Sequence, residues 1–361
     1  MRNLSDLYNN INFCAILTTG RTGSDYLQAC LDNVPGVLTF SGHFHYYKFC
    51  ENLKINEFDN LDPLKILELF IKKNHHLFTN DSEENKFIDL NLEKFKNVFK
   101  EICKNEKLNR KKFLLAIYYA YHLTLERDDK NIITMVHHAH HVDETRKFLK
   151  DFKNSKLLIT IRDPRANLKS GILNWSRYDK SKENQHHFYL YIKRIREDLK
   201  FAKKLKNEKL FIKLEEANEI ATKKKLTNFL SVKYSPEIMK ATFAGKVWIG
   251  DKLSQFKSLD GEYNKKNIDN EWNKFFTKKD KLILDFIYRD YIPFGYNINK
   301  TNLSKLIYIF FLIPFPFFFD KNIFNLKYYF ERKVHLKKKI IDLYFYLKRV
   351  LYLYTLLFRF N

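Results

Sequence analysis

Short apolar runs alternate with helix-forming segments along this 361-residue chain, and this alternation limits its fold more than any other feature. Each run is short and bounded by polar or Gly-containing segments, as expected for a buried strand. Strands that alternate with helices predict an α/β fold with a parallel, doubly wound sheet. The runs lie at residues 13–19, 36–40, 131–136, 156–161 and 209–216.

Two regions interrupt or follow this pattern. Residues from about 61 to 125 place apolar side chains at helical spacing, as in "LDPLKILELFIKK". This spacing predicts a helical insertion, which we expect to cover the functional site. After Lys300 the Phe-rich stretch "LIYIFFLIPFPFFF" precedes a tail rich in Lys, Arg, Tyr and Leu. We therefore expect one domain over residues 1–300 and a helical, aromatic and basic tail over residues 301–361.

The net charge of +23 favours anionic partners, which include nucleotides, nucleic acids, sulfated or phosphorylated glycans and acidic lipids. Lys, Asn, Ile and Phe are abundant throughout while Gly and Pro are few, so part of the charge reflects composition bias. The cysteines lack CxxC spacing and the density of a disulfide framework, which indicates reduced thiols. They are Cys14, Cys30, Cys50 and Cys103.

The segment "TTGRTGSD" at residues 18–25 follows the first run and opens a helix. A tight loop in this position presents backbone N–H groups and the positive end of a helix dipole to an anion. It does not fit the nucleoside-triphosphatase pattern GxxxxGK[ST], because Gly20 and Gly23 are too close together and the basic residue is Arg21. The loop therefore predicts an anion site of another kind.

A second segment, "RDPRANLKSG", follows the run at residues 156–161. Arg162 begins it, Pro164 suits the first turn of a helix, and Ser170 falls one to two turns into that helix. A guanidinium offers a planar fork to phosphate oxygens, and the later hydroxyl can point back to the same anion. The pair predicts a phosphate site.

In this order the two segments resemble those of sulfotransferases that use 3′-phosphoadenosine-5′-phosphosulfate (PAPS). The resemblance implies a three-layer, P-loop-like α/β fold with a central parallel sheet. It also implies that the loop holds the phosphosulfate, where Arg21 contacts the transferring group, and that Arg162 and Ser170 hold the 3′-phosphate. The donor-binding residues implied are Thr19, Gly20, Arg21, Thr22, Gly23, Ser24, Asp25, Arg162 and Ser170.

The resemblance extends from about Asn12 to Tyr296, where "KLFIKLEEAN" and "LTNFLSV" also match and "WIGDKLSQFKSLDGEY" corresponds to a late donor-binding loop. The main departure is Asp25, which stands where many members carry a hydroxyl residue. A carboxylate beside a phosphate costs free energy unless a cation or the helix dipole offsets it.

The reaction also requires a base for the acceptor hydroxyl. His43 and His45 in "SGHFHYY" are the candidates, and we favour His43 because it comes first after the Ser-Gly turn. A neutral imidazole suits proton acceptance near pH 7. The alternative is that His43 only hydrogen-bonds backbone groups and moves no proton.

A further cluster, "HHAHH" at residues 137–141, is expected to leave the end of the third strand at the same edge of the sheet. We expect His137, His138 and His140 to bind the acceptor or to share the role of base. Zinc ligation stays open for these imidazoles, but no carboxylate or Cys pattern accompanies them in the sequence. No metal is expected.

Residues 301–361 suggest attachment to a membrane surface. The Phe-rich stretch is short for a membrane span and carries Pro314 and Pro316, whereas the basic, aromatic flanks suit a helix in the membrane interface. The acceptor expected is therefore a carbohydrate or lipid-linked glycan, and nucleic acid is not expected. Because the sequence opens without a leader pattern, the expected location is cytoplasmic, on the inner face of the membrane.

Two other functions remain open from the sequence. One is a nucleotide-dependent kinase with an atypical phosphate loop, which would prefer ATP with magnesium. The other is a non-catalytic protein of the same fold that binds membranes or polyanions through its basic surface, an alternative that Asp25 supports.

Overall fold

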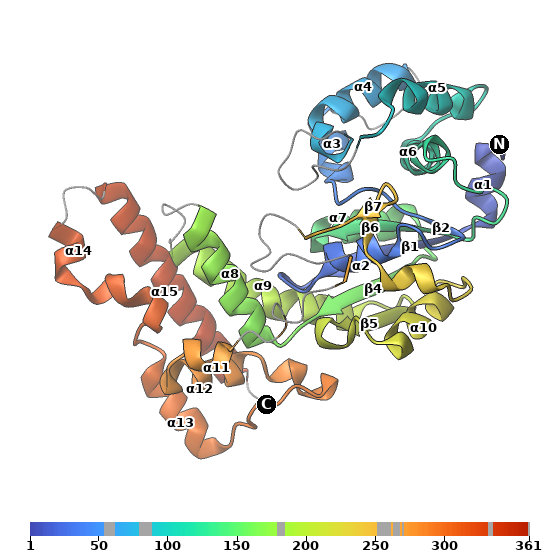
Figure 1. Ribbon diagram of the computed structural model, residues 1–361. Helices are drawn as coiled ribbons and strands as arrows, with labels where there is room; N and C mark the ends of the chain where they lie inside the picture. The colour runs from blue at the N-terminus through green and yellow to red at the C-terminus, as the bar shows by residue number, and fades with distance from the viewer. Residues whose placement is uncertain are drawn as a thin grey trace. The chain divides into compact units, whose positions relative to one another are not determined.

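The computed structural model describes residues 1–53, 62–78, 89–178, 185–250, 261–262, 268, 271–330 and 335–359, without the side chains of 175–178, 185–187 and 321–323. The chain divides into two compact units (Figure 1). The sheet unit comprises Met1–Thr18, Thr22–Ile161 and Leu205–Ile268. The helical unit comprises Thr19–Arg21, Arg162–Lys204 and Asp269–Asn361.

Within the described part of the sheet unit, five parallel strands form the centre, in the order β2-β3-β1-β4-β5. The interior strands are nearly continuous runs of buried residues, as expected for a parallel sheet that is covered on both faces. The expected α/β class and parallel sheet are thus confirmed. The strands are β1 (Asn12–Thr18), β2 (Val37–Leu38), β3 (Thr134–His140), β4 (Lys156–Ile161) and β5 (Lys209–Lys213).

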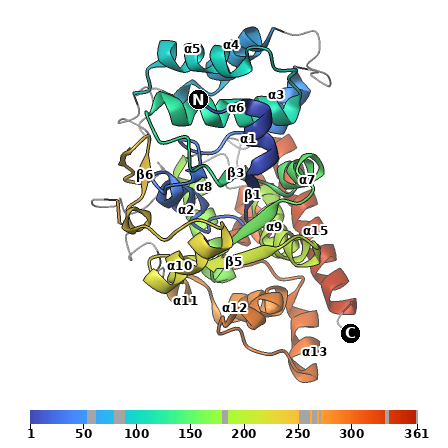
Figure 2. The same cartoon turned by 90° about the vertical axis from the view of Figure 1, so that its right-hand side faces the viewer.

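Helices α2 (Ser24–Leu31) and α7 (Val142–Asp151) cover opposite faces of this sheet (Figure 2). Cys14 and Ile16 belong to the same buried cluster as the α2 side chains. Phe13, which points to the other face, stacks on Phe152 at the end of α7 with ring centroids 4.3 Å apart. The unit therefore has the three layers expected from the sequence.

The insertion between β2 and β3 is helical, as expected for residues 61–125. Its longest helix, α6, is buried nearly all round because it packs against α1, α5 and β2. Helix α1 (Leu4–Asn10) precedes β1. The helices of the insertion are α3 (Tyr46–Asn52), α4 (Pro63–Lys73), α5 (Leu92–Cys103) and α6 (Arg110–Thr124), with a 3-10 turn at His75–Leu77.

The remainder of the sheet unit completes its core. Helix α10 (Ile220–Phe229) packs on β5, and Trp248 lies beside Tyr26 and Phe243 in the cluster beneath α2. Residues 251–260 and Tyr263 of the expected late donor-binding loop lie outside the described residues. The other elements are β6 (Thr242–Phe243), β7 (Lys246–Val247) and 3-10 turns at Leu214–Glu216 and Pro236–Met239.

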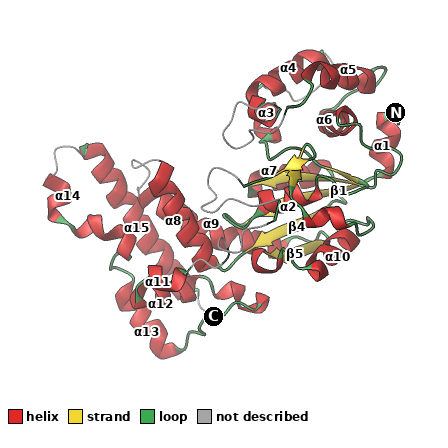
Figure 3. Ribbon diagram, viewed as in Figure 1, coloured by secondary structure: helices red, strands yellow, loops and turns green. Residues whose placement is uncertain are grey.

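The helical unit contains no strand among its described residues (Figure 3). Among its described residues the longest helix is α15, which packs along α9 where Phe345 and Tyr352 contact Tyr189. Other α15 side chains contact the segment before it, as Asp342 contacts Tyr328 and Arg349 contacts Asp320. The buried residues of α15 are Lys339, Asp342, Tyr346, Arg349, Leu353 and Leu356. The helices are α8 (Pro164–Tyr178), α9 (Gln185–Lys204), α11 (Trp272–Phe275), α12 (Lys278–Ile287), α13 (Leu303–Leu312), α14 (Leu326–Phe330) and α15 (Leu336–Phe358), with 3-10 turns at Arg289–Phe294 and Phe318–Phe324.

Residues 301–361 thus belong to the same compact unit as α8 and α9. The domain boundary expected at residue 300 stays a prediction. Among the described residues, no helix combines the length and the hydrophobicity needed to cross a membrane.

The strand order reverses between β1 and β4. From β1 the chain passes to β2, on one side of the sheet, whereas from β4 it passes to β5, on the other. In open α/β sheets ligands bind outside the carboxyl ends of strands at such a reversal. The segments that leave these two strands begin at Thr19 and Arg162, which are the two segments singled out from the sequence.

Candidate functional site

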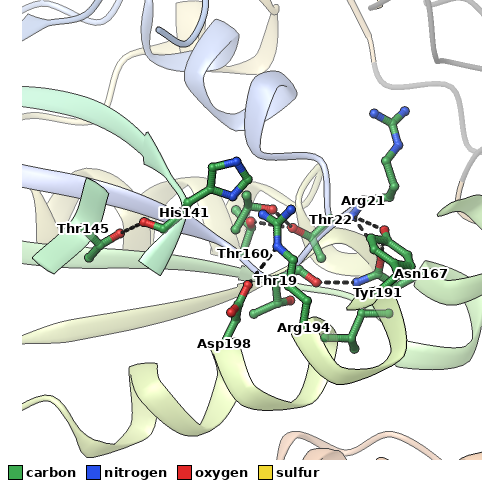
Figure 4. Close-up of polar contacts among 12 residues, drawn as sticks. Thr19, Arg21, Thr22, His141, Thr145, Thr160, Asn167, Tyr191, Arg194 and Asp198 are labelled. Carbon is green, nitrogen blue, oxygen red and sulfur yellow. Dashed lines mark hydrogen bonds and ion pairs between the residues drawn. The ribbon is translucent and has the colours of Figure 1, made fainter. Parts of the chain in front are cut away.

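The first half of the loop, Thr19–Arg21, is held by two side chains of the helical unit (Figure 4). The Arg21 backbone N–H donates to Asn167 Oδ1 at 2.8 Å and to the Tyr191 hydroxyl oxygen at 3.0 Å. Asn167 Nδ2 donates in turn to the Thr19 carbonyl at 2.8 Å, and the Tyr191 hydroxyl donates to Asn167 Oδ1 at 2.7 Å. We call Asn167 and Tyr191 the loop clamp.

The clamp explains why residue 20 is a glycine. Gly20 has a φ of +114°, which L side chains rarely adopt, and a Cβ there would lie 2.8 Å from both Asn167 Oδ1 and the Tyr191 hydroxyl. The loop therefore keeps this shape only with glycine at position 20.

Arg162 lies beside this half of the loop. Its side chain is 4% exposed, and Nη1 lies 3.5 Å from the Arg21 carbonyl oxygen. Burial raises the pKa of Tyr191, while the charges of Arg21, Arg194 and Arg162 pull it down. The guanidinium groups of Arg21 and Arg162 thus place positive charge near the clamp, whereas that of Arg194 is paired with Asp198 at 3.0 Å.

Ser170, the other predicted 3′-phosphate residue, lies in α8 and is half-buried. Its neighbour Lys169 senses the same positive field: burial lowers the pKa of Lys169, Glu271 raises it, and the Arg162 charge lowers it further. Arg162 thus follows the end of β4 and Ser170 lies in the helix that comes after it, while a shared role in phosphate binding stays a prediction.

Asp163 and Arg165 have a structural role at the strand-to-helix junction. The Arg165 guanidinium is 3% exposed, bonds to both Asp163 carboxylate oxygens and donates to Asp285 Oδ1 at 2.8 Å. It also lies 3.8 Å from the centre of the Trp272 ring. Arg165 therefore anchors the start of α8 to α11 and α12.

The second half of the loop belongs to the sheet unit. The Thr22 hydroxyl lies 2.8 Å from that of Thr18 and 2.6 Å from that of Thr160, and all three side chains are buried. This hydroxyl links the ends of β1 and β4 and is already engaged. Its placement does not favour the direct side-chain contact with phosphate that the sequence suggested for Thr22.

Gly23 and Ser24 begin helix α2. Gly23 is the N-cap with a φ of 75°, and a Cβ there would lie 2.4 Å from Leu214 Cδ1. A glycine N-cap supplies no side chain to cap the first turn, so the amide groups of that turn face whatever lies at the helix terminus. Such a terminus suits an anion.

Asp25, in the first turn of α2, points its carboxylate toward two histidines. Its Oδ1 lies 3.3 Å from His43 Nδ1 and 3.4 Å from His138 Nδ1. His43 belongs to the segment after β2, and His138 belongs to β3. Residues from three parts of the sequence therefore meet within the sheet unit.

The sheet unit gathers five imidazole rings, which we call the histidine cluster: His43, His45, His138, His140 and His141. His43 stacks on His140 with ring centroids 4.4 Å apart and planes 7° apart. His45 stacks on His141 at 5.4 Å and 3°. The sequence predicted that "SGHFHYY" and "HHAHH" reach the same edge of the sheet, and these contacts bring them together.

An irregularity in β3 shapes the cluster. The sequence predicted the histidines of "HHAHH" at the end of the third strand. Instead β3 runs to His140, so His137, His138 and His140 lie within the strand. The pairing with β1 shifts between Ile16–His138 and Leu17–His140, and His140 has a φ of 55°. Such bulges often turn side chains toward functional sites.

His137 lies on the other face of β3. It is completely buried, its Nδ1 lies 2.9 Å from the Tyr118 hydroxyl, and its ring stacks on Phe148 of α7. Burial lowers the pKa of His137 to about 3, so it is neutral. This placement in the core does not favour the acceptor contact expected for His137.

Asp25, His43 and His138 together fit the donor set of a metal site. Among the described residues, one carboxylate and two imidazoles, from Asp25, His43 and His138, have ligand atoms within 4.8 Å of one another. Carboxylate oxygen and imidazole nitrogen are common zinc ligands. The sequence showed no carboxylate near "HHAHH", because Asp25 reaches the cluster only through the fold.

Sequence reasoning missed Asn167, Tyr191 and Gln28. Asn is a poor residue for the middle of a helix, so Asn167 in "RANLKS" carried a weak signal of a tertiary role. Tyr191 and Gln28 carried none, because their partners are distant in the sequence.

No protein-family model matches the sequence, and no curated protein matches it significantly. Among solved structures, the chain is similar to a sulfotransferase domain from the curacin biosynthetic pathway, with 14% identity over 80% of this chain and 99% of that one, at a TM-score of 0.44. It is also similar to the sulfotransferase domain of the Synechococcus PCC 7002 olefin synthase, with 13% identity, 80% and 97% coverage and a TM-score of 0.43.

A third similar structure is retinol dehydratase in complex with androsterone and the inactive cofactor PAP, with 12% identity, coverage of 81% of this chain and 83% of that one, and a TM-score of 0.35. The chain thus resembles sulfotransferase domains in its fold. At these identities and TM-scores the likeness carries no argument about its activity.

Proposed function

We propose that the chain transfers a sulfo group from PAPS to a hydroxyl of a carbohydrate or lipid-linked glycan. The observation that carries this proposal is the contact between the two predicted anion segments, 141 residues apart: Arg162 Nη1 lies 3.5 Å from the Arg21 carbonyl, and Asn167 bonds on both sides of Gly20. The loop and the segment after β4 can therefore serve one nucleotide.

In this proposal Arg162 and Ser170 bind the 3′-phosphate of the donor. The loop from Thr19 to Ser24 binds the 5′-phosphosulfate through its backbone and Arg21. Because the Arg21 amide is engaged by the clamp, its contribution comes from the guanidinium. A guanidinium is a strong partner for phosphate and sulfate oxygens.

The chemistry is an in-line displacement at sulfur. The acceptor oxygen forms a bond to sulfur, the bond from sulfur to the phosphate oxygen breaks, and 3′,5′-adenosine bisphosphate (PAP) leaves with the electron pair. Arg21 stabilises the developing phosphate charge, and His43 accepts the hydroxyl proton. Positioning and electrostatics supply most of the acceleration, as in phosphoryl transfer.

Thermal stabilisation by PAP without metal tests the donor site. At about 100 times its Kd a ligand stabilises by about 2.7 kcal/mol, which for a chain of this size raises Tm by several degrees. Arg162→Lys and Ser170→Ala should reduce the shift, whereas Arg146→Lys, at an exposed position of α7, should not. A larger shift with ATP and magnesium would indicate a kinase, and no shift with either would favour the non-catalytic alternative.

Sulfo transfer to a panel of glycans tests the base. His43→Ala should lower the rate by about 10² to 10⁴, the usual contribution of a general base. A loss that follows His45→Ala or His140→Ala instead would move the role within the histidine cluster.

We also propose that residues 301–361 attach the protein to the anionic inner face of the membrane. Helices α13 and α15 expose large apolar side chains, among them Ile307, Phe311, Leu347 and Leu351. Within residues 301–330 and 335–359 the acidic side chains are Asp320 and Asp342, and both are buried. Exposed apolar groups beside only positive exposed charge suit an anionic lipid surface.

Vesicle flotation tests this attachment without removing α15, which packs on α9. A Leu347→Ser/Leu351→Ser variant should float less with phosphatidylglycerol vesicles, while Ile220→Ser, at an exposed position of α10, should float as the unaltered protein does. Equal flotation of all three, or equal flotation with phosphatidylcholine alone, would refute the role of these helices.

A further inference from the structure

Gln28 determines where the proton of His138 lies. Gln28 Nε2 is 2.9 Å from both the Phe40 and the Gly42 carbonyl oxygens. Only the amide N–H groups can satisfy two carbonyls, so Gln28 Oε1 must be the atom that faces His138 Nδ1, at 3.0 Å. An amide oxygen accepts only, and His138 Nδ1 therefore carries a hydrogen.

His138 is consequently a neutral, fixed donor. It is 1% exposed, and burial lowers its pKa to about 3 against the opposite pull of Asp25. The His138 Nδ1–H already donates to Gln28 Oε1. The Asp25 carboxylate, 3.4 Å from the same nitrogen, can only share this hydrogen.

Asp25 also contacts His43. An ionised carboxylate only accepts hydrogen bonds, so Asp25 Oδ1, 3.3 Å from His43 Nδ1, favours a hydrogen on that nitrogen. The neutral ring then has its lone pair on Nε2, on the opposite side. The stack on His140, with planes 7° apart, holds the ring orientation.

We propose that Asp25 is a positioning residue that holds His43 in the Nδ1–H tautomer, so that Nε2 accepts the proton of the acceptor hydroxyl. This inference rests on the proposed function. When the acceptor oxygen bonds to sulfur and PAP departs, the proton moves to Nε2, and the Asp25 carboxylate stabilises the imidazolium until the proton passes to solvent. A carboxylate that orients a histidine in this way is known from hydrolase triads.

The same network argues against a metal bound by these three residues. A metal at the shared position would need the lone pairs of both Nδ1 atoms, but the His138 Nδ1 atom faces the Gln28 oxygen and carries a hydrogen. The cluster around His43 comprises Asp25 from α2, His45 from its own segment, and His138 and His140 from β3. Among the described residues of this set, Asp25 is the only carboxylate.

The first test reads the tautomer directly and requires no activity. In the full-length protein with 15N-labelled histidine, the His43 ring signals are identified by their loss in His43→Gln. We expect the Nδ1–H tautomer in the unaltered protein and its loss in Asp25→Asn, while Asp6→Asn, which removes an exposed carboxylate from the first turn of α1, changes nothing. An Nε2–H tautomer, or no response to Asp25→Asn, overturns the inference.

The second test uses kinetics and donor binding. Asp25→Asn should lower kcat by about 10² to 10⁴ without reducing the thermal shift by PAP, and Asp25→Glu should retain more activity because it keeps the carboxylate. An unchanged kcat in Asp25→Asn contradicts the positioning role. If PAP fails to bind the unaltered protein, the proposed function fails, and the tautomer still decides the Asp25–His43 pair.

A zinc titration completes the set. Micromolar zinc should leave the His43 and His138 ring signals in place. Shifts of both rings that disappear in Asp25→Asn would make these residues metal ligands and overturn the inference.

Discussion

The two halves of the loop after β1 are surrounded by different chemistry. Thr19–Arg21 lie in the helical unit with the Asn167 amide, the Tyr191 hydroxyl and the Arg162 guanidinium. From Thr22 to Asp25 the loop lies in the sheet unit, and Asp25 contacts the histidine cluster. Near neutral pH amides and hydroxyls stay uncharged and guanidiniums stay charged, whereas an imidazole with an ordinary pKa titrates there.

This contrast separates two tasks of the proposed reaction. A donor held by permanent charge binds over a wide pH range, while proton transfer needs a group whose protonation changes near neutrality. The predictions below test the two sides of the contrast separately.

The largest effect expected is a loss of stability in acid, which comes from the two fully buried histidines of β3. Burial lowers the pKa of both His137 and His138 to about 3, below the 6.5 of an unfolded histidine. Between these values the unfolded chain binds protons that the folded chain does not. The free energy of unfolding is therefore unaffected by these histidines above pH 6.5 and falls as the pH drops toward 3. The slope is at most about 1.4 kcal/mol per pH unit for each histidine.

Denaturant unfolding measured from pH 7 to pH 4.5 checks this expectation. His137→Gln keeps a polar partner for Tyr118 but removes one of the two titrating groups, so its stability should depend less steeply on pH. If the free energy of unfolding depended on pH equally in both proteins, His137 would not contribute to the acid sensitivity.

The next effect concerns the loop clamp. Gly20→Ala forces an unfavourable φ and a contact of 2.8 Å with both clamp side chains, so we expect PAP affinity to fall by at least about 100-fold. Gly245→Ala is the matched control, because Gly245 also has a positive φ but its added Cβ would meet nothing closer than 3.9 Å. Calorimetric titration with PAP should separate them, and equal affinities would show that the loop shape does not matter.

The smallest effects come from single clamp contacts. Asn167→Ala leaves the Thr19 carbonyl without its amide donor and should weaken PAP about tenfold, while Asn174→Ala, a buried asparagine of the same helix, should not. Tyr191→Phe removes one hydroxyl and leaves Asn167 in place, so a loss of about fivefold is expected. Tyr288→Phe, at another buried tyrosine, is its control. The loss of PAP affinity should decrease in the order Asn167→Ala, Tyr191→Phe, Tyr288→Phe.

Much of the fold could be predicted because its signals are local. The apolar run at residues 156–161 became β4 with the same bounds, and Pro164 begins α8 as expected. The loop and the Arg162 segment stood out for the same reason, since strand, turn and helix signals lie within a few residues of each other.

The pairings within the site could not be predicted. Asn167 and Tyr191 contact Arg21 from 146 and 170 residues away, and nothing near them in the sequence indicates this. The adjacent residues His137 and His138 look equivalent in the sequence, but strand alternation sends one into the core under α7 and the other toward Asp25.

By itself, the sequence determined the alternation of strands and helices, the glycine-containing loop and the arginine that follows β4, because each depends on neighbouring residues. Only the tertiary structure decided the surroundings of Asp25, which the sequence presented as a carboxylate misplaced beside a phosphate. The fold brings β3 and the segment after β2 to the first turn of α2, so this carboxylate faces two imidazoles. Its partners are set by strand order and register, which no local pattern encodes.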